Sequence, residues 1–291
     1  MTDRVVVRAP ATVANLGPGY DVLGLSLGWY DEVRAERHDA LEITASGIGA
    51  EGVKRDESNG VVRAMIALLG ETPAVRLHKL TAVSFGRGFG SSAIGFVAGL
   101  VAARALFDTG HTDDELLRVA VELEGHPDNV APCLLGGVTV CAADRVVRLE
   151  PPPGLRVIVC VAPTRLPTEE ARRVVPETYS RSDALFNSGR VAMLTAALAT
   201  DRTDVLLEAT DDVFHQPARF ELMPDSAAVV RTLRAQGMAA FLSGAGPSVA
   251  AFVRAEDGEA MAARARQAVA DGWDVRVETI DAQGATVVER R

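Results

Sequence analysis

The pattern of apolar and polar residues predicts short β-strands in three segments of the first half of the chain. Apolar and polar residues alternate over residues 41–45 and 75–83, and residues 4–8 are a short run rich in valine that also favours a strand. Between the two alternating segments, residues 59–69 carry apolar side chains at helical spacing, and this pattern predicts an amphipathic helix. Residues 10–19 hold two prolines and two glycines, which exclude a regular helix and indicate a loop.

Two further helices are expected in the middle of the chain. Residues 91–107 are predominantly apolar and directly follow a glycine-rich run. A second helix should begin after Thr112 and end near Glu124, because Thr112 can cap it and Glu115 completes a capping box.

The run PPPG at residues 151–154 is the clearest punctuation in the chain and predicts a domain boundary. The chain then divides into residues 1–153 and residues 154–291, and an apolar run over residues 155–162 opens the second part as a buried strand. Strands and helices mixed in this way favour an α+β architecture over a regular doubly wound sheet. The other expected elements are helices at residues 168–174, 182–199, 225–236 and 256–270, and strands at residues 138–141, 146–149, 238–242, 248–253 and 275–280.

Composition narrows the classes of function. With 291 residues, of which 48% are hydrophobic, the chain can bury a substantial core. A net charge of −9 provides no broad basic surface for nucleic acid or for an anionic membrane, so small-molecule partners are expected. The apolar run at residues 93–103 ends at Arg104, which makes it too short for a membrane span.

The cysteines and the N-terminus bear on localisation. The chain has an odd number of cysteines, and they lack the spacing of metal ligands: Cys133, Cys141 and Cys160. This is typical of proteins in a reducing compartment. After Arg4, only residues 5–7 form an apolar run before Arg8, and this run is too short for a signal peptide. These features predict a soluble cytoplasmic protein; the sequence leaves open whether it forms a homodimer.

The run GRGFGSSA at residues 86–93 is the first candidate for chemistry. Alternating glycines let successive backbone N–H groups face one anion, and the helix that follows adds its positive end. The run lacks the lysine of a P-loop. Considered alone, it is as compatible with a glycine-rich turn whose serines cap the helix as with a phosphate-binding loop.

Three other motifs accompany this run. They are NLGPGYD at residues 15–21, EGHPDNVAP at residues 124–132 and LSGAGPS at residues 242–248. Their order and approximate spacing resemble those of the GHMP kinases, the group of galactokinase, homoserine kinase, mevalonate kinase and phosphomevalonate kinase. The opening residues 7–21 resemble the homoserine kinase branch in particular.

The resemblance implies a two-domain GHMP kinase-like fold. Its N-terminal domain is a mixed-sheet nucleotide-binding domain, and its C-terminal domain is a ferredoxin-like α/β sandwich. It also implies ATP and Mg²⁺ as cofactors, and phosphorylation of L-homoserine to O-phospho-L-homoserine, a step of threonine biosynthesis. The expected nucleotide contacts are Ser84, Gly86, Arg87, Gly88, Phe89, Gly90, Ser91 and Ser92.

Ser92 and Glu124 are the metal pair that the resemblance implies. A hydroxyl and a carboxylate suit Mg²⁺, which keeps water and phosphate oxygens as its other ligands. The alternative is a helix-capping serine and a solvated glutamate at a helix end. For Arg87 the alternative is likewise a solvated side chain.

The acceptor site needs a cation for a carboxylate and acceptors for an ammonium group. Segments similar to the family's point to Thr168 and Arg172 and, further on, to Arg219 on the carboxylate side. Asn15 and Asp21 could instead only hydrogen-bond their own turn, and residues 243–247 could be an ordinary hairpin turn. The expected substrate contacts are Asn15, Asp21, His126, Asn129, Thr168, Arg172, Arg219 and Gly244.

Asn15, Asp21 and Asn129 are the expected catalytic residues. Mevalonate kinase-like relatives carry an aspartate where this chain has Asn129, and an amide cannot act as a general base. Phosphoryl transfer requires mainly alignment and charge neutralisation, so direct attack by the homoserine hydroxyl on the γ-phosphate is the expected mechanism. Whether the neighbouring Asp128 acts as a base stays open.

Two other functions fit parts of the sequence. The first is another GHMP small-molecule kinase, of the mevalonate-pathway type, whose acceptor lacks an ammonium group. The second is a non-catalytic regulator that binds a nucleotide without turnover. The presence of Ser92, Glu124 and both arginines argues against the second.

Overall fold

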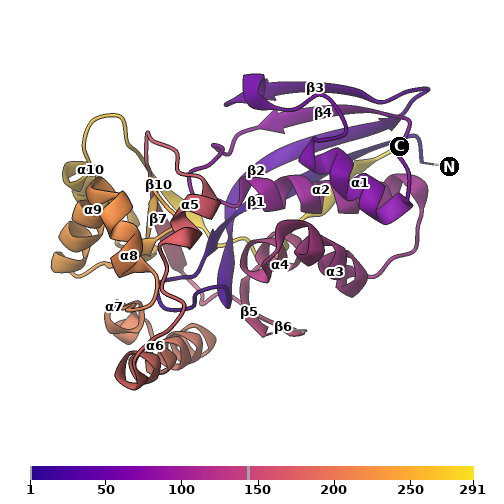
Figure 1. Cartoon of the computed structure of the whole chain (residues 1–291). Coiled ribbons are helices and arrows are strands. Elements are labelled where there is room, and N and C mark those ends of the chain that lie inside the picture. The colour runs from indigo at the N-terminus through magenta and orange to yellow at the C-terminus, as the bar shows by residue number, and fades with distance from the viewer. Residues whose placement is uncertain (1, 143–144) are drawn as a thin grey trace.

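A computed structural model of the chain describes residues 2–142 and 145–291. The strands form two sheets, one built mainly from the first half of the chain and the other from the second half. Figure 1 shows the two sheets side by side, each with its own helices. The expected α+β architecture with two parts is confirmed.

The first sheet is mixed, as expected. Its main path has the order β11-β1-β2-β4-β3, while β5 pairs with the start of β2 and β6 pairs with β5. Among the residues that the structure describes, β3 and β4 are the only parallel neighbours in this sheet. The strands are β1 (Arg4–Ala14), β2 (Leu23–Arg37), β3 (Glu42–Gly47), β4 (Val75–Thr81), β5 (Val138–Ala142), β6 (Arg145–Leu149) and β11 (Thr286–Arg290).

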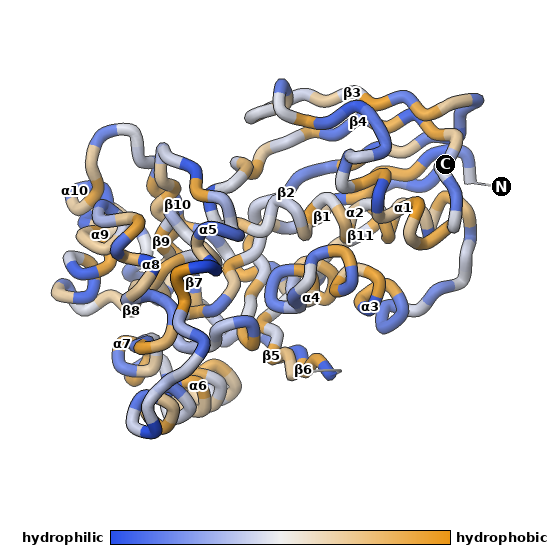
Figure 2. The backbone as a smooth tube through the Cα atoms, viewed as in Figure 1, coloured by the Kyte–Doolittle hydropathy of each residue, from blue (hydrophilic) through white to orange (hydrophobic). Residues whose placement is uncertain are grey.

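Four helices cover one face of this sheet (Figure 1). The central one is buried along most of its length, and Gly99 lets it approach its neighbour so closely that a Cβ there would lie 2.3 Å from the Val61 carbonyl oxygen. Figure 2 shows hydrophobic residues recurring through this pair of helices. The four are α1 (Gly60–Leu69), α2 (Ser91–Phe107), α3 (Asp113–Glu124) and α4 (Pro127–Leu135).

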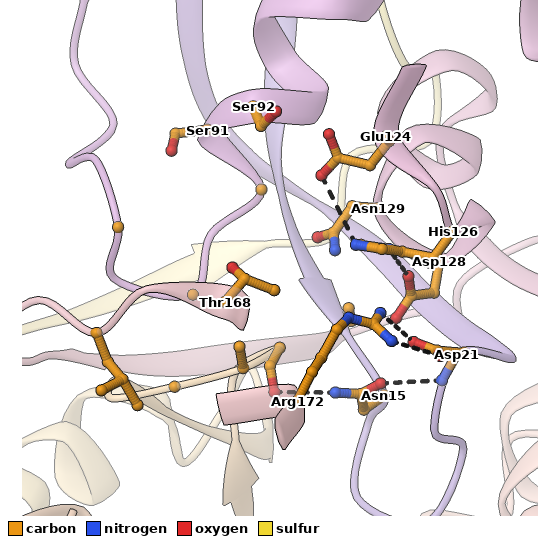
Figure 3. A pocket seen from close by; sticks show the side chains of 18 of the residues that line it. Asn15, Asp21, Ser91, Ser92, Glu124, His126, Asp128, Asn129, Thr168 and Arg172 are labelled. Atoms are coloured by element: carbon orange, nitrogen blue, oxygen red, sulfur yellow. Dashed lines mark hydrogen bonds and ion pairs between the residues drawn. The ribbon is translucent and has the colours of Figure 1, made fainter. Parts of the chain in front are cut away.

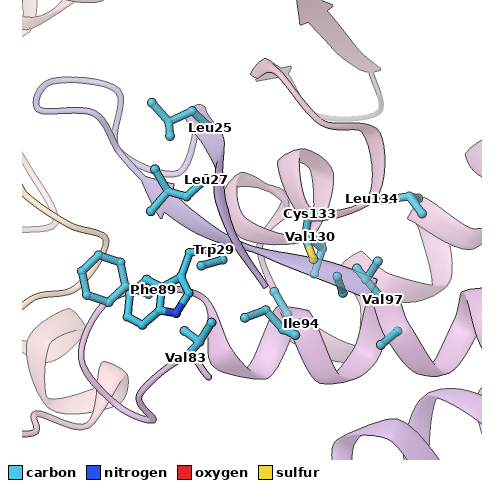
Figure 4. Packing of buried hydrophobic residues seen from close by; sticks show 14 of the residues in the cluster. Leu25, Leu27, Trp29, Val83, Phe89, Ile94, Val97, Val130, Cys133 and Leu134 are labelled. Carbon is cyan, nitrogen blue, oxygen red and sulfur yellow. The ribbon is translucent and has the colours of Figure 1, made fainter. Parts of the chain in front are cut away.

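The core between sheet and helices reaches the glycine-rich run. Trp29 on β2 and Phe89 in that run pack edge to face, with ring centroids 5.3 Å apart (Figure 4). Cys133 lies in the same core, and Cys141 and Cys160 are also buried, so the three thiols serve as core residues.

The second sheet is antiparallel throughout, with the order β10-β7-β9-β8. In chain order this is fourth, first, third, second, the arrangement of a ferredoxin-like sandwich, and α9 and α10 pack against it. Its strands are β7 (Leu155–Val161), β8 (Ala239–Leu242), β9 (Val249–Arg254) and β10 (Asp274–Thr279). The remaining helices are α5 (Thr168–Arg173), α6 (Arg181–Thr200), α7 (Leu206–Ala209), α8 (Gln216–Leu222), α9 (Pro224–Ala235), α10 (Gly258–Ala268) and the short 3-10 turns Ala50–Gly52 and Thr203–Val205.

Elements with local start and stop signals agree with the expectation. The helix expected at residues 91–107 has these bounds in the structure. The capping box is present at the start of α3, where Thr112 Oγ1 accepts from the Glu115 N–H and Glu115 Oε2 accepts from the Thr112 N–H.

Two expectations need correction. The loop expected from Pro10 is strand as far as Ala14, because an irregularity in the β1–β2 register next to Pro10 accommodates a residue without an N–H. The second part, residues 154–291, was expected to form one domain, but its last strand, β11, pairs with β1 in the first sheet. There it satisfies backbone groups along an edge that would otherwise be open. The long strand β2 was not expected at all.

Candidate active site

The four motifs meet in one cavity of about 90 Å³, lined from both halves of the chain. Figure 3 shows the glycine-rich run and the start of α2 on one side, and Asp21, Asn15 and Arg172 on the other. The predicted site residues that line it are Asn15, Asp21, Gly86, Gly88, Gly90, Ser91, Ser92, Glu124, His126, Asn129, Thr168, Arg172, Arg219 and Gly244.

The glycines of residues 86–90 have conformations that other residues rarely adopt. Gly86, Gly88 and Gly90 have φ values of 66°, 88° and 64°. A Cβ on Gly88 would lie 2.1 Å from the Ser243 carbonyl oxygen, and a Cβ on Gly90 would lie 2.1 Å from Thr12 Oγ1. The run therefore brings bare backbone to the cavity, directly before the N-terminal turn of α2, where unpaired N–H groups favour an anion.

Three predicted nucleotide contacts do not line this cavity. Phe89 is buried in the core against Trp29, so its side chain points away from the site. Ser84 is also buried and lies before the run. The Arg87 guanidinium donates to the Pro163 carbonyl oxygen at 3.2 Å and links the run to the second half of the chain.

A second cavity of about 320 Å³ adjoins the first, and Gly86, Ser91 and Ser92 line both. Its walls combine apolar and cationic side chains, among them Phe85 and Lys79. The Lys79 ammonium lies 5.0 Å from the Phe85 ring centroid and 3.2 Å from the buried Asp31 carboxylate. The glycine-rich run thus separates a small polar cavity from a larger, partly apolar one.

Glu124 and Ser92 face each other across the small cavity (Figure 3). Burial raises the pKa of Glu124, although the Ser92 hydroxyl and the nearby His126 oppose the rise. A carboxylate held in such surroundings would gain from a cation beside it, and the pair of oxygen donors fits Mg²⁺.

His126 and Asp128 form a close pair at the start of α4. The imidazole Nδ1 lies 2.6 Å from Asp128 Oδ1, and Nε2 lies 3.9 Å from Glu124 Oε1. Burial disfavours the charged imidazole, but the hydrogen bond and charge of Asp128 outweigh burial and raise the pKa of His126. Oxygen and nitrogen atoms of Asp21, His126 and Asp128 all lie within 4.8 Å of one another.

Asn129 and Asn15 are fixed by hydrogen bonds from neighbouring segments. Thr12 Oγ1 donates to Asn129 Oδ1 at 2.7 Å, so the Asn129 amide N–H groups are left for the cavity side. Asn15 Nδ2 donates to the Gly244 carbonyl oxygen at 2.9 Å, while Asn15 Oδ1 accepts from the Asp21 N–H at 3.1 Å. Asn15 and Asp21 do bond within their own turn, as the alternative interpretation required, but both also line the cavity.

Two arginines from the second half reach the same end of the cavity. Arg172 donates to both carboxylate oxygens of Asp21, at 2.6 and 2.9 Å, and these bonds raise the pKa of Arg172. Arg219 is only 1% exposed, and its Nε and Nη1 donate to carbonyl oxygens of Ala171 and Gly244. A buried guanidinium that lines a cavity is a strong candidate for binding a carboxylate.

Sequence reasoning missed two residues of this site. Asp128 lines the cavity, a position that the sequence analysis did not assign to it. His215 contacts both Arg219 and the loop at residues 15–21. A signal for Asp128 was available, because Pro127 at the first position of a helix places the next residues in its N-terminal turn.

Comparisons with known proteins agree with the geometry. The family description "GHMP kinases N terminal domain" matches residues 58–137, and "GHMP kinases C terminal" matches residues 193–271. The homoserine kinase of Streptomyces avermitilis is 43% identical over 296 residues, which cover 98% of this chain and 95% of the relative. The chain belongs to the homoserine kinase family. Another member of this family, the homoserine kinase of Synechococcus, is 40% identical and covers 98% of the chain.

Solved structures extend the family assignment to the fold. The crystal structure of homoserine kinase from Cytophaga hutchinsonii has a TM-score of 0.87 and 31% identity, and covers 99% of this chain and 98% of that one. Mevalonate diphosphate decarboxylase from Staphylococcus aureus, at 17% identity and a TM-score of 0.72, shares the fold alone. Membership in the GHMP kinases implies the use of ATP. In residues 2–142 and 145–291, no helix has the length and apolar character to cross a membrane.

Proposed function

We propose that this member of the homoserine kinase family transfers the γ-phosphoryl group of ATP to the side-chain hydroxyl of L-homoserine. The observation that carries the proposal is one cavity with two chemically different ends. The glycine-rich run and the start of α2 form one end, and Asp21 with Arg172 and Arg219 forms the other. The two ends suit a nucleotide triphosphate and a zwitterionic amino acid.

The charged groups at the acceptor end complement both charges of homoserine. Arg172 and Arg219 offer planar guanidinium groups for the α-carboxylate, and Asp21 offers a carboxylate for the ammonium. Mevalonate has a carboxylate but no ammonium, so it would leave Asp21 without a charged partner once Arg172 bound the acceptor. The charge pattern therefore favours homoserine over acceptors of the mevalonate type.

ATP is the expected occupant of the donor side. The triphosphate suits the backbone of residues 86–90 and the N-terminal turn of α2. The adjoining cavity of about 320 Å³, with Phe85 and Lys79 in its walls, suits the base. The two cavities share lining residues, so one nucleotide can extend through both.

Ser92 and Glu124 would hold Mg²⁺. Both line the small cavity, and the partly desolvated Glu124 carboxylate is suited to a cation. Bound there, Mg²⁺ would supply charge neutralisation at the phosphates. The residues of the chain supply alignment and hydrogen bonds.

The transfer itself forms a bond between the homoserine oxygen and the γ-phosphorus as the bond to the ADP oxygen breaks, and the hydroxyl proton is released. Asn15, Asp21 and Asn129 line the cavity, where they would orient the hydroxyl. The amide of Asn129 cannot take the proton, so alignment and charge neutralisation carry the reaction.

An ADP-release assay with a panel of acceptors tests the proposal. Purified protein is given Mg-ATP with homoserine, mevalonate, galactose or shikimate in turn. Turnover with homoserine alone is the expected result. Turnover with mevalonate would support a different GHMP kinase, and ATP binding without turnover of any acceptor would support a non-catalytic regulator.

A further inference from the structure

We infer that His215 is a positioning residue for the acceptor site, and that it acts by joining the buried Arg219 to the loop that carries Asn15 and Asp21. The identity of the acceptor rests on the proposed function; the joining contacts do not. His215 immediately precedes α8, whereas the loop follows β1, so the contact spans 198 residues of sequence.

Both nitrogens of the His215 ring are in use. The ring is fully buried, and Arg219 Nη1 lies 3.0 Å from Nδ1 while Nε2 lies 2.8 Å from the Gly17 carbonyl oxygen. A guanidinium can only donate and a carbonyl oxygen can only accept. The contacts therefore fix the neutral tautomer in which Nδ1 accepts and Nε2 donates.

These two bonds complete a closed ring of hydrogen bonds. Arg219 Nη1 donates to the Gly244 carbonyl oxygen at 3.2 Å, and the same oxygen accepts from Asn15 Nδ2 at 2.9 Å. From Asn15 the chain leads two residues on to Gly17, whose carbonyl returns to His215. The ring links the end of β1, the start of α8 and the turn between β8 and β9.

The backbone of the loop at residues 15–21 needs contacts from other segments to keep its conformation. Asn15, Gly17 and Asp21 all have positive φ values, of 70°, 89° and 57°. A Cβ on Gly17 would lie 2.5 Å from the Thr210 carbonyl oxygen, so the loop packs closely against the segment before α8. Conformations of this kind persist only where neighbouring groups hold them.

Aromatic packing supports the same connection. The Tyr20 ring stacks on His215 with centroids 5.2 Å apart, and the Arg219 guanidinium lies 5.2 Å from the Tyr20 ring centroid. Asp212 Oδ2 accepts from the N–H groups of His215 and Gln216, which fixes the backbone that presents the imidazole. His215 thus couples the carboxylate end of the acceptor site to Asn15 and Asp21 without itself lining the cavity.

Three substitutions of His215 separate its two contacts. His215→Phe keeps a ring against Tyr20 and removes both hydrogen bonds. His215→Asn can keep an acceptor near Nδ1 for Arg219, and His215→Gln can keep a donor near Nε2 for Gly17. The matched control is Gln216→Met at the next residue, the first of α8, which removes a different buried hydrogen bond, from the Leu242 N–H.

The expected result is a selective effect on the acceptor. In His215→Phe, KM for homoserine should rise by about 10-fold or more while KM for ATP changes by less than about 3-fold, since a small misplacement of binding groups is costly. The KM for homoserine of His215→Asn and of His215→Gln should lie between the values of His215→Phe and the wild type. Gln216→Met should lower Tm and leave KM for homoserine unchanged.

Two outcomes would overturn the inference. One is a folded His215→Phe, or folded Asn and Gln variants, with the wild-type KM for homoserine. The other is a nitrogen-15 NMR spectrum of the wild type that places the His215 proton on Nδ1 instead of Nε2. That tautomer would contradict the closed ring of hydrogen bonds, whether or not any variant folds. If the wild type itself fails to phosphorylate homoserine, the proposed function fails, and the NMR measurement still decides the tautomer.

Discussion

Asp21 and Arg172 form a two-point ion pair between the two halves of the chain, with Nη2 to Oδ1 at 2.6 Å and Nη1 to Oδ2 at 2.9 Å. Asp21 follows β1, and Arg172 lies on α5. Both residues are assigned to the acceptor site. In the free protein, the positive charge of Arg172 is paired with the negative charge of Asp21. A zwitterionic acceptor could replace this single ion pair by two ion pairs. Its carboxylate would pair with Arg172, and its ammonium would pair with Asp21.

Arg172→Lys tests this exchange. Lysine keeps the positive charge but cannot make the planar two-point contact, so KM for homoserine should rise about 10- to 100-fold, in line with the strength of charged hydrogen bonds. KM for ATP should change little. Steady-state kinetics with each substrate varied in turn provide the measurement.

Arg173→Lys is the matched control, because Arg173 is the next residue of α5 and is exposed. It should leave both KM values unchanged. An equal KM for homoserine in Arg172→Lys and the wild type would remove Arg172 from the acceptor site.

Local signals explain which elements the sequence could predict. The helices α2 and α3 are bounded by glycine-rich turns and by a capping box, which act within a few residues. The strand β11 has no such signal, because it exists only where the distant edge of β1 pairs with it. For β2, the two glycines Gly24 and Gly28 weaken the strand pattern, and both stand where another segment leaves no room for a Cβ.

The residues of the candidate active site also divide into those that local sequence signals predict and those that depend on distant segments. The glycines of residues 86–90 could be predicted as part of the site because the backbone there requires glycine and because three further motifs accompany the run. The two contacts of His215 depend on how distant segments pack, and the sequence holds no local trace of them. For Asp128, the sequence marks only its place in the first turn of a helix. Phe89 illustrates the opposite error, since membership in the run suggested a nucleotide contact while packing against Trp29 directs the ring into the core.

Gly88→Ala tests the close approach of the glycine-rich run to the β8–β9 turn. Alanine is strained at a φ of 88°, and its Cβ would meet the Ser243 carbonyl oxygen. The variant should lose about 1–3 kcal/mol of stability and raise KM for ATP more than KM for homoserine. Thermal unfolding and steady-state kinetics give the two readouts.

Gly189→Ala is the control, because Gly189 lies within α6 and a Cβ there would meet nothing within 4 Å. It should stabilise the protein by about 0.5–1 kcal/mol. A Gly88→Ala variant with wild-type KM for ATP would mean that the run does not contact the nucleotide.

Tyr30 provides a pH-dependent prediction away from the site. Burial, together with the hydrogen bond that its hydroxyl donates to Asp281 at 2.9 Å, raises the pKa of Tyr30 to about 12. The folded state thus favours the neutral phenol, so this contribution to stability is complete below pH 10, the ordinary pKa of tyrosine, and is lost between pH 10 and 12.

Urea unfolding of the wild type and Tyr30→Phe between pH 8 and 11 measures this effect. The stability difference should stay constant to about pH 10 and shrink above it. In absorbance titration at alkaline pH, Tyr30→Phe should lack the last-titrating phenol. A difference that does not depend on pH would show that the phenol is not held neutral by the fold.

Glu124→Gln tests the metal pair. The amide is nearly isosteric but lacks the charge that suits a divalent cation, so the Mg²⁺ concentration needed for half-maximal activity should rise about 10- to 100-fold. The kcat at saturating Mg²⁺ should also fall, because charge neutralisation in phosphoryl transfer depends on where the cation sits. Glu122→Gln, on the same turn of α3 but exposed, should leave the Mg²⁺ titration unchanged. If Glu124→Gln and the wild type respond identically to Mg²⁺, Glu124 is not a ligand, and its raised pKa reflects burial alone.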